Sequence, residues 1–131
     1  MDPQSLKFTS THEWVAIAGD EATIGITRFA VEQLTDLLLI DLGRAGVGTR
    51  LTAGQEFGEI ESVKSVSDLY CPVAGEVIAV NPAVADDVQV LARDPYGEGW
   101  LIKVRLSDPT APISGLMDHQ TYQRTVADSS H

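Results

Sequence analysis

The stretch EFGEIESVKSVSDLY, residues 56–70, holds the pattern from which the fold can be inferred. Small or apolar residues alternate with glutamates along residues 56–62, which predicts a strand whose small and apolar side faces inward. Lys64 follows between this strand-like run and the next, so a tight turn would present its amine to solvent. A solvated surface charge is one interpretation of Lys64. Because loops on rigid scaffolds often carry function, attachment of a group at this amine is another.

Short strand-like runs occur on both sides of this stretch. Gly19-Asp20-Glu21, between the first two runs, is typical of a hairpin turn. The runs are residues 14–18, 22–26, 38–42, 56–62, 75–81 and 100–106. The sequence therefore predicts a mainly β fold. The glycine-rich connection at residues 43–55 lacks the Gly-Lys-Ser/Thr ending of a phosphate-binding loop, so that interpretation is disfavoured.

Three segments have helical character. Ala30, Leu34, Leu37 and Leu38 recur at helical spacing, which predicts one apolar face on a helix that Thr27 could cap. Asn81-Pro82 is typical of a helix start, and we expect this helix to reach about residue 92. A further helix is expected at residues 118–127, with residues 128–131 disordered.

The length and charge of the chain limit its function. Its 131 residues predict a single domain, residues 1–131. The formal net charge of −10 argues against binding to nucleic acid or to anionic membrane surfaces, and favours partners with basic surfaces. No run of 18 apolar residues is present, which argues against a transmembrane helix, and the first residues resemble no secretory signal.

Few residues suggest catalysis. The sequence contains no hydrolytic constellation and no Cys or His pair at metal-ligand spacing. His12, beside a glutamate, is more typical of a packed or solvated residue than of an acid–base group. Cys71 is the single cysteine, so no intramolecular disulfide can form, and we expect it to be a small buried hydrophobe. The acidic residues around Lys64 would form a platform for another protein; they are Glu56, Glu59, Glu61, Asp68 and Glu76.

Several separated motifs resemble one family, the H proteins of the glycine cleavage system. The resemblance covers roughly residues 6–126 in the family's order. Its motifs are HEWV (12–15), ATIGIT (22–27), EFGEIESVKS (56–65), PVAGEVIAVN (72–81) and DPYGEGWLIKVRLSD (94–108). It implies a barrel-sandwich hybrid, the fold of lipoyl and biotinyl carriers: two antiparallel sheets with a few short helices, and the modified lysine at a hairpin tip.

The resemblance also implies a function without catalysis. Lipoate would be attached to Lys64 by enzymes that form this amide. The loaded carrier would take the aminomethyl group of glycine from a pyridoxal-phosphate glycine decarboxylase (P protein) to a tetrahydrofolate-dependent aminomethyltransferase (T protein). A dihydrolipoyl dehydrogenase (L protein) would then reoxidise it. By motif, Thr11, Glu13 and Asp68 would contact the loaded arm, because hydroxyls and carboxylates suit an ammonium group. Glu13 could instead be a surface charge, and Asp68 a turn-capping residue.

Several alternatives stay open. The chain could be an H-like lipoyl protein that serves lipoate relay or sulfur oxidation, or an unmodified acidic β-sandwich that binds other proteins. Ser65 and Cys71 depart from the family's usual residues, and a mixed disulfide between Cys71 and the reduced arm is a minor hypothesis. Residues 43–48 and 85–94 also depart from the family pattern. The sequence suggests a bacterial-type cytoplasmic protein, with a mature mitochondrial form as the alternative.

Overall fold

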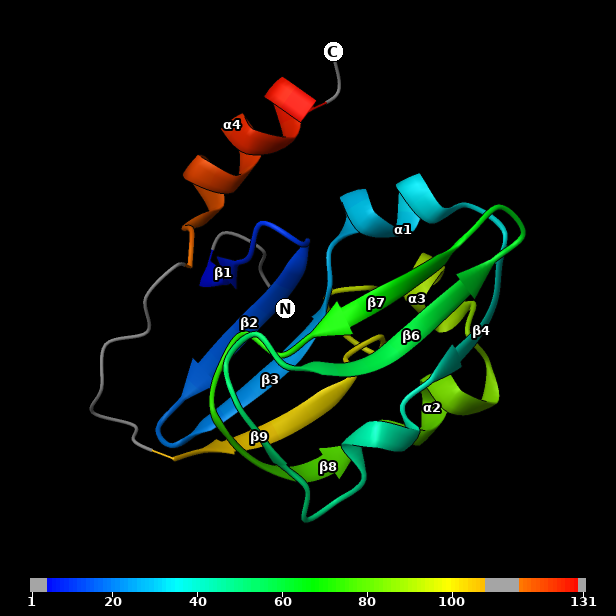
Figure 1. Ribbon diagram of the computed structural model, residues 1–131. Helices are drawn as coiled ribbons and strands as arrows, with labels where there is room; N and C mark the ends of the chain where they lie inside the picture. Colours follow the sequence, from blue (N-terminus) through cyan, green and yellow to red (C-terminus); the bar gives the residue numbers. More distant parts are fainter. Residues whose placement is uncertain (1–4, 108–115, 130–131) are drawn as a thin grey trace.

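The computed structural model describes residues 5–107 and 116–129, and its strands form two antiparallel sheets (Figure 1). The larger sheet has the strand order β1-β2-β3-β9-β8-β5. Its strands are β1 (Lys7–Phe8), β2 (Glu13–Ala18), β3 (Glu21–Ile26), β5 (Arg50–Leu51), β8 (Gly75–Val80) and β9 (Ile102–Leu106).

The smaller sheet has the order β4-β6-β7. Its strands are β4 (Leu37–Asp41), β6 (Glu56–Ser62) and β7 (Val66–Tyr70). The two antiparallel sheets and the short helices confirm the predicted mainly β fold. The hairpin expected around Gly19 also forms, because Gly19 takes the positive φ of 64° that lets Ala18 pair with Glu21.

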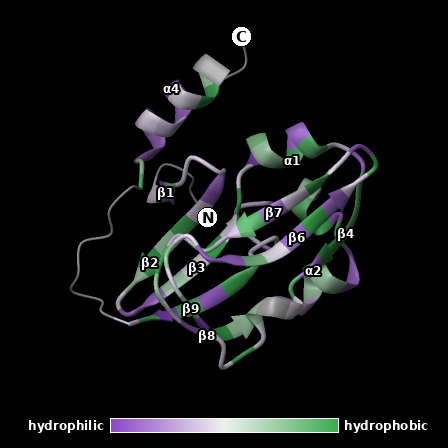
Figure 2. Ribbon diagram, in the orientation of Figure 1, coloured by the Kyte–Doolittle hydropathy of each residue, from purple (hydrophilic) through white to green (hydrophobic). Residues whose placement is uncertain are grey.

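Alternation of side chains along the strands builds the main core. In β9 the predicted inward residues Ile102, Val104 and Leu106 are buried, and in β6 the same holds for Ile60 and for Ser62. Hydrophobic and hydrophilic residues accordingly alternate along several strands (Figure 2). This burial of apolar area from both sheets is the main force that holds the sandwich together.

A second, smaller cluster lies under the C-terminal helix α4 (His119–Ser129). Leu6, Phe8 and Trp14 are buried there together with Tyr122 of α4. The Tyr122 ring stacks on the Phe8 ring with centroids 4.6 Å apart. Tyr122 therefore anchors α4, which projects from the body of the molecule in Figure 1.

Helix α1 (Arg28–Leu34) starts where the sequence predicts. The Thr27 hydroxyl accepts a hydrogen bond from the Ala30 N–H at 3.2 Å, as an N-cap does. Leu34 is buried and Ala30 packs against the main core, so the predicted apolar face exists along this helix.

The prediction that this helical face continues to Leu37 and Leu38 is wrong. Thr35 and Asp36 have φ of 47° and 37°, which ends the helix, and Leu37 begins β4 opposite Ser62 of β6. The strand pairing buries Leu37 in the core and leaves Leu38 53% exposed. Pairing between strands, which a local period cannot detect, overrides the helical spacing here.

The predicted helix at residues 82–92 is two short helices, α2 (Pro82–Asp86) and α3 (Val90–Arg93). Asn81 caps α2 as expected, since its side chain accepts from the Ala83 N–H at 3.0 Å. Asp87 interrupts the helix because its carboxylate accepts from the Gln89 N–H at 3.0 Å.

Helix α4 confirms the predicted C-terminal helix and extends it by two residues. Residues 128 and 129 are helical, so the expectation that they are disordered is wrong, while 130 and 131 lie outside the described residues. Among the described helices, none has the length and apolar character needed to cross a membrane.

Candidate functional site

The turn between β6 and β7 holds Lys64 at a fixed position. The Ser62 N–H donates to the Ser65 carbonyl at 2.8 Å. The Ser62 hydroxyl donates to the same carbonyl and accepts from the Ser65 N–H, both at 3.2 Å. Ser62 is buried, and these bonds close a four-residue turn with Val63 and Lys64 at its centre.

A second element supports this turn from the side. The Val63 N–H donates to the Asp36 carbonyl at 3.1 Å. Asp36 is one of the two residues with positive φ that form the bend after α1. The hydrogen bond therefore places the C-terminal end of α1 against the hairpin. In Figure 1 the β6–β7 turn projects from the body beside this end of α1.

Lys64 itself is exposed. Among the described residues, none makes a hydrogen bond or ion pair with its ammonium group. The hairpin therefore holds the backbone of Lys64 firmly and leaves its Nζ free for reaction.

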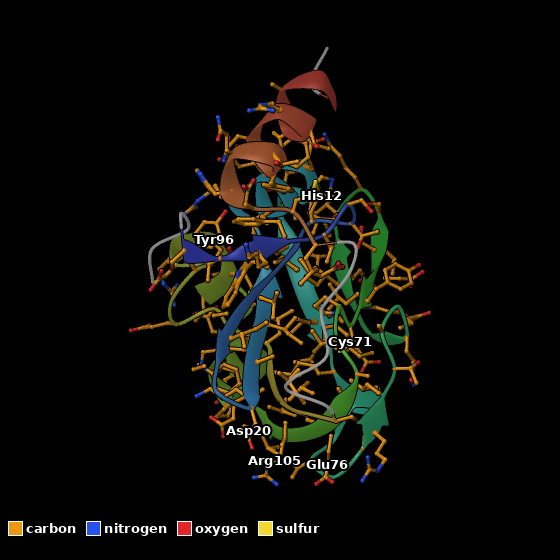
Figure 3. The ribbon with its side chains drawn as sticks, turned by 90° about the vertical axis from the view of Figure 1, so that its left-hand side faces the viewer. His12, Asp20, Cys71, Glu76, Tyr96 and Arg105 are labelled. Atoms are coloured by element: carbon orange, nitrogen blue, oxygen red, sulfur yellow. The ribbon has the colours of Figure 1, made fainter. Side chains whose placement is uncertain are left out.

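The acidic platform forms only in part. Carboxylate oxygens of Glu56, Glu59 and Asp68 lie within 4.8 Å of one another, and Glu59 and Asp68 are directly opposite in the β6–β7 register. Glu61 is on the same strand as Glu59. Glu76, however, lies in β8 of the other sheet, and Figure 3 places it at the end of the molecule away from His12. Glu76 was therefore wrongly included in this platform, because sequence proximity does not show which sheet a strand joins.

Glu13 is buried, so its interpretation as a surface charge is wrong. It is 1% exposed, and its Oε1 accepts from the hydroxyls of Thr9, at 2.6 Å, and of Thr11. Its Oε2 accepts from the Tyr70 N–H at 3.3 Å. Burial raises the pKa of Glu13, and these hydrogen bonds oppose that rise. Since Glu13 begins β2 and Tyr70 ends β7, the carboxylate joins the two sheets.

A cavity of about 260 Å³ opens beside the hairpin. Its polar lining comes from the hairpin, from the loop before β2 and from α1. These lining residues are Thr11, His12, Gln33, Ser65, Ser67 and Asp68. The structure thus brings together two of the three predicted arm contacts, Thr11 and Asp68, next to the turn that carries Lys64.

Glu13 lines a neighbouring cavity of about 460 Å³ together with Thr11, Tyr70 and Cys71. Thr11 lines both cavities, and its hydroxyl donates to the Glu13 carboxylate. Glu13 is therefore linked to the first cavity indirectly, through this hydrogen bond. Cys71 is fully buried, and its Sγ–H donates to the Val73 carbonyl at 3.0 Å. This burial confirms the expected small buried hydrophobe. It also raises the pKa of Cys71 to about 11, which argues against the mixed disulfide.

The structure adds His12 and Tyr122 to the site. His12 Nδ1 is 2.8 Å from the Tyr122 hydroxyl oxygen, which is 2.7 Å from Thr27 Oγ1. The sequence could indicate His12 through its neighbour Glu13. It gives no signal for Tyr122, which is 110 residues away along the chain.

A two-sheet β domain that presents a free lysine at a hairpin tip belongs to the class of lipoyl and biotinyl carriers. The family model "Glycine cleavage H-protein" matches residues 6–129. The chain is 50% identical over 129 residues to the glycine cleavage system H protein of Nitratidesulfovibrio vulgaris strain DP4, covering 98% of both chains. It is 45% identical over 124 residues to the H protein of Bacteroides fragilis, covering 95% of this chain and 96% of the other.

A solved structure is also similar. The crystal structure of a glycine cleavage system H protein from Mycobacterium marinum matches with a TM-score of 0.84 and 34% identity, over 99% of this chain and 100% of that one. The chain belongs to the glycine cleavage H-protein family. Members of this family carry lipoate on a lysine, and the chain is accordingly a non-catalytic lipoyl carrier of the glycine cleavage system. It works with the P, T and L proteins of that system.

Proposed function

We propose that Lys64 is the residue that carries the lipoyl group, through an amide at Nζ. The observation that supports this most is the exposure of Lys64 at a turn closed by the Ser62–Ser65 hydrogen bonds. The other two lysines are less suitable. Lys7 lies within β1, paired opposite Val15 of β2 and not in a turn, and the Lys103 ammonium lies 5.0 Å from the centroid of the Trp100 ring.

The residues around Lys64 fit a lipoyl group. When bound, lipoate supplies a dithiolane whose sulfur takes up the aminomethyl group of glycine. The hairpin fixes the base of the arm, and the 260 Å³ cavity beside it can hold the arm's loaded end.

Thr11, Glu13 and Asp68 would then act on the loaded arm in different ways. Thr11 and Asp68 line the cavity, where a hydroxyl and a carboxylate can accept hydrogen bonds from an ammonium group. The Thr11 hydroxyl donates to Glu13 Oε1, which leaves the lone pairs of Thr11 Oγ1 free to accept. Glu13 would therefore act mainly by orienting Thr11.

Mass spectrometry tests the attachment site. The chain is co-expressed with a lipoate ligase and lipoate, and wild type, Lys64→Arg and Lys7→Arg are compared by intact mass and peptide mapping. We expect one lipoyl group in wild type and Lys7→Arg and none in Lys64→Arg. Modification of another lysine, or none in wild type beside a lipoylated control protein, would refute the assignment.

The arm contacts need a separate test. Holo carrier is loaded with glycine by the decarboxylase, and the lifetime of the loaded form is followed by mass spectrometry. We expect Thr11→Val and Asp68→Asn to shorten this lifetime several-fold, and Glu61→Gln, which does not line the cavity, to leave it unchanged. Equal lifetimes in all four proteins would refute the docking of the arm in this cavity.

We also propose that residues 1–131 act as one lipoyl-carrier domain in a bacterial cytoplasm. The packing of Tyr122 of α4 against Phe8 of β1 supports the single domain, and the similarity to bacterial H proteins supports the location. Limited proteolysis, which should release no stable fragment, and cell fractionation test these two statements. Lipoate-attaching enzymes would be further partners, and they would recognise the same hairpin.

A further inference from the structure

The hydroxyl of Tyr122 connects the C-terminal helix to the cavity beside the hairpin. Tyr122 is 2% exposed, and its Oη lies between Thr27 Oγ1, at 2.7 Å, and His12 Nδ1, at 2.8 Å. His12 lines the cavity and follows Thr11, one of the proposed arm contacts. Its backbone has a φ of 70°, so contacts around it must hold this unfavourable conformation in place.

Counting protons and acceptors fixes the direction of these hydrogen bonds. Thr27 Oγ1 already accepts from the Ala30 N–H, and among the described residues the acceptor within reach of its own proton is Tyr122 Oη. The Tyr122 proton must then be donated to His12 Nδ1. The opposite direction would leave the fully buried hydroxyl proton of Thr27 without an acceptor, which is unfavourable.

Two further observations agree with this direction. Burial raises the pKa of Tyr122 to about 12, so its hydroxyl keeps the proton that it donates. Burial also lowers the pKa of His12, which favours the neutral ring. A neutral ring that accepts at Nδ1 carries its own proton at Nε2.

We propose that Tyr122 is a positioning residue of the carrier: it fixes His12 as the Nε2–H tautomer, so that the ring offers the loaded arm an N–H donor and no lone pair. The proposal rests on the docking of the arm in this cavity. It assigns a role in protecting the loaded carrier to the C-terminal helix, 58 positions beyond Lys64 in the sequence.

The chemistry of an aminomethyl sulfide explains why the tautomer matters. A lone pair at Nε2 could take a proton from the ammonium group of the arm. The neutral amine nitrogen could then form a double bond to its carbon while the carbon–sulfur bond breaks, with that bond's electron pair leaving on sulfur as a thiolate. Water would convert the released iminium ion to formaldehyde and ammonium. An Nε2–H group cannot accept the first proton, so it does not start this loss.

Nitrogen NMR of the unmodified, ¹⁵N-labelled chain tests the tautomer without any activity. We expect His12 to show a protonated Nε2 and an unprotonated Nδ1 in wild type, and a measurable Nδ1–H population in Tyr122→Phe. Tyr96→Phe is the matched control, because the Tyr96 hydroxyl accepts a hydrogen bond from the Arg28 N–H and makes none with His12. An Nδ1–H tautomer in wild type, or an unchanged tautomer in Tyr122→Phe, would overturn the proposal.

The lifetime of the loaded carrier tests the consequence. We expect Tyr122→Phe to shorten it about tenfold, below the 10²-fold or more that a well-placed general base can contribute. Adding His12→Gln, which keeps an N–H donor and removes the basic ring, should restore the lifetime. An unchanged lifetime in Tyr122→Phe, or a lifetime that stays short in the double variant, would overturn the protective role. If Thr11→Val and Asp68→Asn have no effect either, the docking of the arm fails as well. If they shorten the lifetime, docking stands and the role of Tyr122 alone fails.

Discussion

The turn that carries Lys64 should depend on the Ser62 side chain and not on the Ser65 side chain. The Ser62 hydroxyl makes two hydrogen bonds, both to backbone atoms of Ser65. In Ser62→Ala both are lost, while the Ser62 N–H still donates to the Ser65 carbonyl at 2.8 Å. In Ser65→Ala every one of these bonds remains, because Ser65 contributes its main chain and its side chain is exposed.

The magnitude follows from this geometry. A typical hydrogen bond within a protein contributes about 0.5–1.5 kcal/mol to stability. The two bonds of the Ser62 hydroxyl are both 3.2 Å long, at the weak end, so we expect Ser62→Ala to lower the free energy of unfolding by about 1–2 kcal/mol. In a chain of this size that corresponds to a fall in Tm of roughly 3–8 °C. Ser65→Ala should stay within about 0.5 kcal/mol of wild type.

Two assays separate folding from function. Urea unfolding gives the free energy of unfolding of both variants. The rate of lipoylation by a ligase reports how well the turn presents Lys64 to that enzyme. We expect Ser62→Ala to reduce kcat/KM for lipoylation several-fold and Ser65→Ala to leave it unchanged. Equal effects of the two substitutions on stability, or a Ser62→Ala variant as stable as wild type, would refute the view that this hydroxyl holds the turn.

Three further predictions follow from buried groups. Burial raises the pKa of Glu13, so the folded state binds its proton more tightly than the unfolded chain. The free energy of unfolding of wild type, relative to that of Glu13→Gln, should therefore fall as the pH rises from the ordinary pKa of Glu13 through its raised pKa in the folded state. Urea unfolding at several pH values measures this difference, and a difference that grows with pH would contradict the prediction. Cys71, with its pKa raised to about 11, should resist iodoacetamide at pH 8 in native protein and react on unfolding in urea; rapid native labelling would refute its burial. At Gly25 an added Cβ would lie 2.5 Å from the ring of Trp14, so Gly25→Ala should lower stability by about 1–3 kcal/mol in thermal unfolding, and an unchanged Tm would show that the ring can move.

The sequence predicted the features that depend on local alternation and turn chemistry. The β2–β3 hairpin formed as expected around Gly19, and β6 placed Ile60 inside and its glutamates outside. Lys64 was predicted at a tip because strand-like runs flank it. Strand period and turn residues are local properties, so a single sequence is enough to detect them.

Prediction failed where partners distant in the chain decide the outcome. Leu37 fits the helical spacing of α1, yet it pairs with Ser62 across the small sheet. Glu13 looks like a charge beside a strand, yet Tyr70 of the other sheet and the hydroxyl of Thr9 surround its carboxylate. No local pattern contains these contacts, because they exist only once both sheets have packed.

The position of Glu13 explains why the cavity and the fold depend on each other. The hairpin that presents Lys64 belongs to the small sheet, whereas Thr11 precedes a strand of the large one. The Glu13 carboxylate accepts from Thr11 on one side and from Tyr70 of the hairpin strand on the other, and so holds the two walls of the cavity together. A carrier must leave its lysine open to several enzymes and still shield what the lysine carries. If Lys64 carries the lipoyl group as we propose, an exposed hairpin tip on the small sheet, beside a cavity at the junction of the two sheets, meets both requirements.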